Sequence, residues 1–80
     1  MFSKEIFGQR ICDLRKNRGE TQEALGALLG VKKNQVSEIE RGNRTTTAER
    51  IALICAHYRV SSDYLLGLTD DPEPKYEVEE

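Results

Sequence analysis

Apolar residues recur three and four positions apart along most of this 80-residue chain, which is the spacing of one face of an α-helix. Phe7, Ile11 and Leu14 form the clearest such stripe in the first segment. No segment alternates apolar and polar positions, the pattern that favours a half-buried strand. The pattern therefore predicts an all-α chain without a sheet. The five expected helices span residues 4–18, 22–29, 32–41, 46–58 and 62–66.

Polar caps precede these segments and glycines follow them. Ser and Thr hydroxyls accept a hydrogen bond from the first turn of a helix, and glycine can adopt the left-handed conformation that ends one. Thr46 and Glu49 match a capping box at the start of the fourth helix. The expected caps are Ser3, Thr21, Thr46 and Ser61, and the expected stops are Gly19, Gly30, Gly42 and Gly67. The expected core residues are Phe7, Ile11, Leu14, Leu25, Leu29, Val31, Val36, Ile39, Ile51, Ile54, Cys55, Tyr58, Val60, Tyr64 and Leu65.

Residues 21–42 contain two of these helices, and the second has a polar, partly basic outer face. Gly30 lies where the chain must leave the first helix, and Gly26 where the two helices cross closely, so a larger side chain would force them apart. This is the layout of a helix-turn-helix, which lays its second helix in the major groove of DNA. The residues of the second helix expected to face away from the core are Lys33, Asn34, Gln35, Ser37, Glu38 and Arg41.

The composition is that of a soluble globular domain, with 38% hydrophobic and 32% charged residues. The formal net charge of −2 is unevenly distributed, since residues 1–69 carry +3 and residues 70–80 carry −5. We therefore expect one mildly basic domain over residues 1–68 and an acidic, flexible tail over 69–80. Without a membrane-spanning apolar run or a signal peptide, the protein is expected to be cytoplasmic and to make no membrane contact.

The chain offers little for catalytic chemistry. Its one histidine, His57, has no nucleophile–base arrangement around it in the sequence, and no glycine-rich loop could cradle a phosphate. Cys12 and Cys55 lie on different expected helices without the spacing of metal ligands, so we expect reduced thiols that act as small hydrophobic residues. No enzymatic activity, cofactor, metal site or small-molecule ligand is therefore expected.

Three segments point to a family. LRKNRGETQ, GVKKNQVSEIERG and VSSDYLLG follow one another between Phe7 and Gly67. In their order and spacing they resemble the phage-repressor-type (Cro-like, Xre) helix-turn-helix family. The resemblance implies a compact five-helix bundle of the lambda-repressor-like DNA-binding type, with the helix-turn-helix at the second and third helices.

The resemblance also implies roles for individual residues. The first turn of the third helix reaches base edges in this family, and lysine and asparagine side chains can pair with guanine and adenine there. The residues expected to read bases are Lys33, Asn34, Gln35, Ser37 and Glu38. The residues expected to contact the DNA backbone are Gln22, Lys32, Arg41, Asn43, Arg44 and Thr45. Arg15 and Glu40 resemble the family's internal ion pair, which ties the first helix to the end of the third.

Several positions depart from the family pattern or leave alternatives open. Glu38 either accepts a hydrogen bond from cytosine N4 or pairs with Arg41 one turn along. Glu20 stands where relatives often bury a leucine, and Arg59 where they usually have glycine. Leu28 lies on a face that relatives usually keep polar.

The residues and the resemblance together predict a sequence-specific transcriptional regulator that binds double-stranded DNA, of the phage or prophage repressor type. A homodimer is expected on a two-fold symmetric site with half-sites about 10 bp apart. The resemblance places the dimer contact near the junction of the fourth and fifth helices and residues 66–68. The alternative is a protein-interaction or antitoxin-like accessory module on the same scaffold, in which Leu28 and the acidic tail bind a partner. A third possibility is the N-terminal part of a longer regulator.

Overall fold

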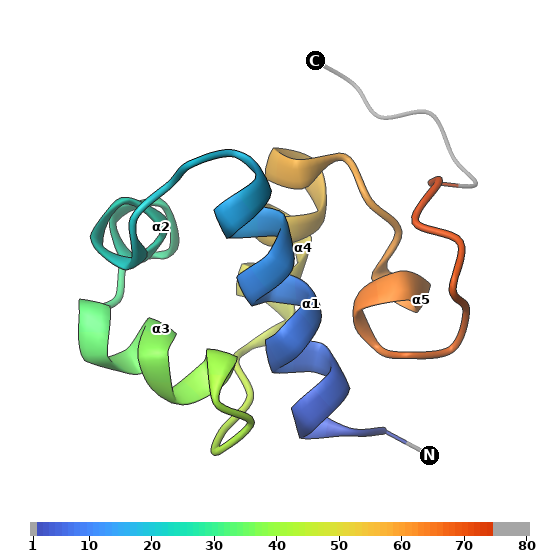
Figure 1. The fold of residues 1–80 in the computed structure, drawn as a ribbon, viewed down its shortest axis with the longest axis horizontal. Coiled ribbons are helices and arrows are strands. Elements are labelled where there is room, and N and C mark those ends of the chain that lie inside the picture. The colour runs from blue at the N-terminus through green and yellow to red at the C-terminus, as the bar shows by residue number, and fades with distance from the viewer. Residues whose placement is uncertain (1, 75–80) are drawn as a thin grey trace.

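The computed structural model describes residues 2–74, and no strand occurs among them, so the predicted all-α fold with five helices is confirmed. α1 crosses the middle of the molecule, with α2 and α3 on one side of it, α5 on the other and α4 behind it (Figure 1). The helices are α1 (Lys4–Asn17), α2 (Gln22–Leu29), α3 (Lys33–Glu40), α4 (Ala48–Tyr58) and α5 (Ser62–Leu65). None of these helices is both long enough and apolar enough to cross a membrane.

Side-chain hydroxyls fix where most of the helices begin. Each accepts a hydrogen bond from the backbone N–H three residues further along the chain. The caps that the sequence predicts correctly are Ser3, Thr21 and Ser61. The capping box predicted at Thr46 and Glu49 is wrong by one residue. Thr47 caps α4 instead, because its backbone is extended and its Oγ accepts from the N–H of Arg50 at 3.3 Å.

After each helix the chain turns through a residue with positive φ. At the end of α3, Gly42 has a φ of 80° and its N–H donates to Ile39 O. The N–H of Asn43 donates to Glu38 O at 3.0 Å. These two bonds form a Schellman motif, which satisfies carbonyls that the helix leaves unpaired. Arg59 takes the equivalent place after α4 with a φ of 57°, so the fourth helix keeps this type of turn without a glycine.

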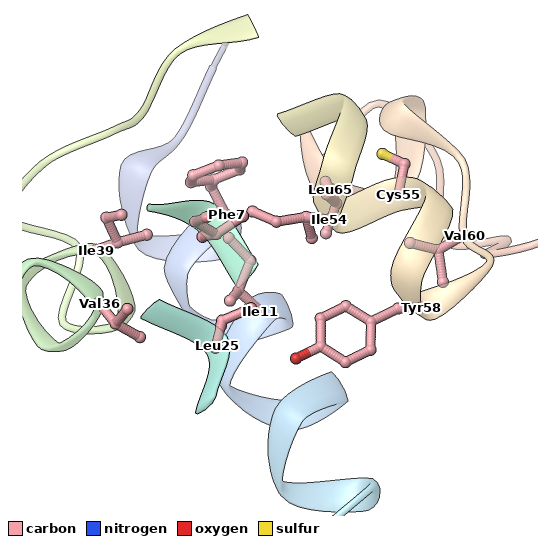
Figure 2. Packing of buried hydrophobic residues seen from close by; sticks show 11 residues of the cluster. Phe7, Ile11, Leu25, Val36, Ile39, Ile54, Cys55, Tyr58, Val60 and Leu65 are labelled. Atoms are coloured by element: carbon pink, nitrogen blue, oxygen red, sulfur yellow. The ribbon is translucent and has the colours of Figure 1, made fainter. Parts of the chain in front are cut away.

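All five helices contribute to one hydrophobic core. Figure 2 shows Phe7 and Ile11 of α1 in the middle of it, with Val36 and Ile39 of α3 on one side and side chains of α4 on the other. The buried hydrophobic residues are Phe7, Ile11, Leu25, Leu29, Val36, Ile39, Ile54, Cys55, Tyr58, Val60 and Leu65. The other expected core residues are only partly buried and pack against this cluster. They are Leu14, Val31, Ile51 and Tyr64.

Two glycines let backbone segments approach closely. A Cβ on Gly8 of α1 would stand 2.1 Å from the carbonyl oxygen of Ile39, at the end of α3. A Cβ on Gly26 of α2 would stand 2.6 Å from the carbonyl oxygen of Val31. Gly26 is therefore needed for close packing, as the sequence predicts, but against the turn rather than against α3. Gly8 has the same need, and nothing in the sequence pattern indicated it.

The acidic segment starts against the domain rather than away from it. Arg10 donates to the carbonyl oxygens of Tyr64 and Thr69, the latter at 2.7 Å, and pairs with Asp70 at 2.7 Å. The N–H of Ser61 donates to Pro72 O at 2.9 Å. These contacts place Thr69, Asp70 and Pro72 against the helical domain. Residues 75–80 of the expected tail lie outside the described part of the chain.

Candidate nucleic-acid interface

α3 has one face in the core and one in solvent. Val36 and Ile39 are 1% and 3% exposed, whereas Lys33 and Asn34 in the first turn are exposed. Gln35 and Ser37, also expected to read bases, are half-buried on the same short helix. The apolar residues thus hold the helix in place, and its first turn keeps polar donors in solvent.

The start of α3 has no side-chain cap. Lys32 takes the cap position with an extended backbone, but its side chain makes no hydrogen bond to the helix. The first N–H groups of the helix therefore keep their partial positive charge, next to two exposed lysines. Arg44 and Thr45 are exposed in the loop after the other end of α3. The lysines at the start of α3 and the polar side chains after its end are thus separated by eight residues of helix, about 12 Å.

Arg15 and Glu40 form the ion pair that the resemblance implied. Arg15 Nε lies 2.7 Å from Glu40 Oε2, and Arg15 Nη2 lies 3.0 Å from Oε1. The two side chains are only 10% and 5% exposed. Arg15 also donates to the carbonyl oxygen of Glu20 at 2.7 Å, so one guanidinium joins α1, the loop after it and α3.

Gln22 belongs to the same network. Its Nε2 donates to Glu40 Oε1 at 3.0 Å, which attaches the start of α2 to the end of α3. Burial raises the pKa of Glu40, but the hydrogen bonds from Arg15 and Gln22 outweigh it and hold the pKa below its usual value. The amide that was expected to contact DNA thus already has a partner inside the protein. Its contact with a phosphate stays a prediction.

Glu38 is bound to its own neighbours in this structure. Its Oε1 accepts from Arg41 Nη2 at 2.7 Å and its Oε2 accepts from Asn43 Nδ2 at 2.9 Å. Hydrogen bonds from Asn43 and Arg41, with a further attraction to Arg44, hold the pKa of Glu38 below its usual value. Of the two alternatives left open by the sequence, the pairing with Arg41 is the one present in this structure.

Glu20, which stands where relatives often bury a leucine, makes polar contacts with α4. Its carboxylate accepts from Tyr58 Oη at 2.6 Å and lies 2.7 Å from His57 Nε2. The hydrogen bond from Tyr58 is the main reason why the pKa of Glu20 lies below its usual value. Arg18 lies over the ring of Tyr58, 5.3 Å from its centroid. A polar cluster thus fastens the loop between α1 and α2 to α4, and sequence spacing did not reveal it.

An apolar groove lies between α4 and α5, on the part of the chain where the dimer contact was expected. Its volume is about 520 Å³. The residues that line it are Ala48, Ile51, Ala52, Cys55, Ala56, Ser62 and Leu66. Within residues 2–74, no cluster of three or more His, Cys, Asp or Glu side chains could hold a metal ion.

α2, the turn at Gly30 and α3 form a helix-turn-helix inside a five-helix domain, which defines the class of protein. A helix-turn-helix family model matches residues 13–65, and the chain belongs to this family.

Individual relatives carry regulator names. The uncharacterized HTH-type transcriptional regulator YobD of Bacillus subtilis is 36% identical over 72 residues, which are 90% of this chain and 64% of YobD. YazB, another uncharacterized HTH-type regulator of that organism, is 41% identical over 61 residues, 76% of this chain and 88% of YazB. The chain thus spans less than two-thirds of YobD.

A solved structure of a repressor is also similar to this chain. The P22 c2 repressor protein, in complex with a synthetic operator, superimposes with a TM-score of 0.70 at 33% identity. The match covers 75% of this chain and 91% of the repressor chain. These names are those of regulators and a repressor and not of enzymes, which agrees with the absence of catalytic motifs in the sequence.

Proposed function

We propose that this chain is a transcriptional regulator of the repressor type that binds double-stranded DNA sequence-specifically. The observation that carries the proposal is the geometry of α3, whose first turn presents Lys33 and Asn34 to solvent while Val36 and Ile39 hold its other face in the core. A helix anchored in this way can enter the major groove as a rigid unit. The regulator names of YobD and YazB, and the operator complex of the P22 c2 repressor, support the proposal.

The proposed contacts divide into two groups. Lys33 and Asn34 donate to base edges, with Gln35 and Ser37 as further readers along the helix. Glu38 reads a base only where it releases Arg41 and accepts from a cytosine instead. Side chains at the start of α2 and at both ends of α3 bind phosphates and set the register on the duplex. The proposed backbone contacts are Gln22, Lys32, Arg41, Asn43, Arg44 and Thr45.

Selection from a pool of random duplexes tests the base-reading assignment. The wild-type protein should return one motif, and Lys33→Ala and Asn34→Ala should each lose base preference at one or two positions of it. Lys16→Ala, which removes an exposed lysine from α1, should return the wild-type motif. If both α3 variants also return the wild-type motif, these two residues do not read bases.

We further propose that the regulator binds as a homodimer, with a second copy seated at the groove between α4 and α5. A single reading helix offers few base contacts, and two copies on half-sites about 10 bp apart would double them. The groove is apolar, and Leu68, three residues after the end of α5, is 65% exposed, so both offer hydrophobic surface to a partner.

A protein-interaction or antitoxin-like role has one observation in its favour, since Leu28 of α2 is 39% exposed. A salt series separates it from DNA binding. Affinity for a duplex should fall by several powers of ten between 50 and 200 mM salt if six to ten phosphates are contacted. A contact centred on a leucine should respond little to salt, because hydrophobic burial involves no counterion release.

A further inference from the structure

The turn after α3 places Asn43 directly beside Glu38. In a Schellman motif the N–H of the residue two positions past the helix cap donates to the carbonyl oxygen of the residue five positions earlier in the chain. The N–H of Asn43 accordingly donates to Glu38 O at 3.0 Å. The same backbone geometry brings the Asn43 amide within 2.9 Å of the Glu38 carboxylate. Arg41, at the cap itself, reaches the other carboxylate oxygen at 2.7 Å.

Both oxygens of Glu38 are therefore occupied by side chains that the proposed function assigns to DNA phosphates. Carboxylates and phosphates present the same feature to a guanidinium or an amide, namely anionic oxygens that accept hydrogen bonds. The Glu38 and Arg41 side chains are 39% and 61% exposed, so a duplex could reach them. A phosphate of the duplex, however, would have to displace the Glu38 carboxylate from Arg41 and Asn43 before it could bind these two donors.

The negative charge of Glu38 also opposes the binding of a phosphate. The hydrogen bonds to Glu38 keep its pKa low, so the carboxylate stays ionised at neutral pH. An ionised carboxylate repels an approaching phosphate and neutralises one of the nearby cations, which reduces the number of counterions that binding can release.

We propose that Glu38 acts as an internal competitor of DNA phosphates, which holds Arg41 and Asn43 and thereby lowers affinity for DNA of arbitrary sequence. This proposal rests on the proposed function. Glu38 is a positioning residue in it, because it acts through the two side chains that would touch the backbone. The pair is a surface contact, so its loss should change DNA binding far more than folding stability.

The test is binding of a 30-bp duplex of scrambled sequence by wild type and Glu38→Gln, measured by fluorescence anisotropy from 50 to 200 mM salt. One more phosphate contact steepens the slope of log K against log salt by about 0.9, which corresponds to about an eightfold gain at 0.1 M. We expect the variant to show both changes. Asp13→Asn removes the same charge from the exposed side of α1, keeps an acceptor for Gln9, and should change affinity less than twofold.

The double variant Glu38→Gln/Arg41→Ala shows whether the effect passes through Arg41. It should lose the gain and return to the shallower slope. The proposal is overturned if Glu38→Gln binds no more tightly than wild type, if Asp13→Asn gains as much, or if the double variant keeps the full gain. The proposed function is overturned with it only if wild type and Glu38→Gln both show no salt-dependent binding to any duplex. Circular dichroism of each variant confirms that it is folded.

Discussion

Gly8 of α1 lies so close to the carbonyl oxygen of Ile39 that no larger residue fits without moving one of the two helices. In most helices an alanine in place of glycine is stabilising by about 0.5–1 kcal/mol, because glycine loses more backbone freedom on folding. At Gly8 the clash with the carbonyl oxygen of Ile39 makes the same substitution destabilising. We expect Gly8→Ala to lower the free energy of unfolding by about 1–3 kcal/mol in urea titrations.

Lys16→Ala is the control for that experiment, since Lys16 is exposed on the same helix and its removal should change stability by less than about 0.5 kcal/mol. A stabilised Gly8→Ala variant would show that α1 and α3 can separate at no cost, against the packing described here.

Arg15 and Arg18 offer a second comparison at the scale of single residues. Arg15 is buried and pairs with Glu40 through two hydrogen bonds, so Arg15→Ala leaves a buried carboxylate without its cation. We expect a loss of about 3–5 kcal/mol, enough to unfold much of a domain this small. Arg18 is exposed, lies over the ring of Tyr58 and is attracted to the charge of Glu20, so Arg18→Ala should cost about 1 kcal/mol or less. Equal urea midpoints for the two variants would contradict the assigned importance of the buried pair.

At the scale of elements, the loop between α1 and α2 depends on the carboxylate of Glu20. Because the hydroxyl of Tyr58 holds the pKa of Glu20 below its usual value of 4.5, the ionised form stabilises the folded protein above that pH. The stabilisation is lost as pH falls through the lowered pKa of the folded state. Thermal unfolding of Glu20→Gln should therefore show a deficit of about 1–2 kcal/mol near pH 5.5 that shrinks towards pH 3.

Glu23→Gln on the exposed side of α2 serves as its control, and its difference from wild type should stay small across the same pH range. Other carboxylates, such as Glu40, titrate in both proteins and cancel from the difference. A deficit of Glu20→Gln that does not change with pH would mean that packing, and not charge, fastens this loop.

The helices themselves could be predicted from the sequence because their information is local. Phe7, Ile11 and Leu14 repeat at helical spacing, and glycines follow four of the five helices. The start of α4 was misplaced because residues 45–47 are three consecutive threonines, any of which can supply the capping hydroxyl. Only the path of the backbone selects Thr47.

In the candidate site, too, the features that depend on neighbouring residues could be predicted from the sequence, whereas contacts between residues far apart in the sequence could not. The outer face of α3 follows from helical period, and the pairing of Glu38 with Arg41 is one of the two alternatives that the sequence left open, consistent with their spacing of three residues. The contacts of Glu20 with His57 and Tyr58 join residues nearly forty positions apart, and no spacing rule connects them. Arg15 and Glu40 lie 25 positions apart, and only the resemblance to a family predicted their pairing.

At the scale of the whole molecule, α3 and the groove between α4 and α5 belong to different parts of the domain, so the proposed DNA contact and the proposed self-association can be altered separately. Ala52 lines the groove, and glutamate there would place a charge in the proposed contact. We expect wild type to sediment at up to twice its monomer mass of 9.1 kDa as concentration rises, and Ala52→Glu to remain at the monomer mass. Ala27→Glu, a matched change on the exposed side of α2, should sediment as wild type does.

Binding experiments with Ala52→Glu also distinguish base recognition from dimer assembly on DNA. A dimer that holds two half-sites gains the second contact at high effective concentration, so its affinity for a full site greatly exceeds that for one half-site. Ala52→Glu should lose most of this advantage on a duplex with both half-sites, yet bind a single half-site as wild type does, because α3 is untouched. If Ala52→Glu binds both duplexes like wild type while remaining monomeric in solution, the two copies meet elsewhere on the domain. If it loses the single half-site as well, the substitution has disturbed the fold that holds α3, and circular dichroism and the urea midpoint would show this directly.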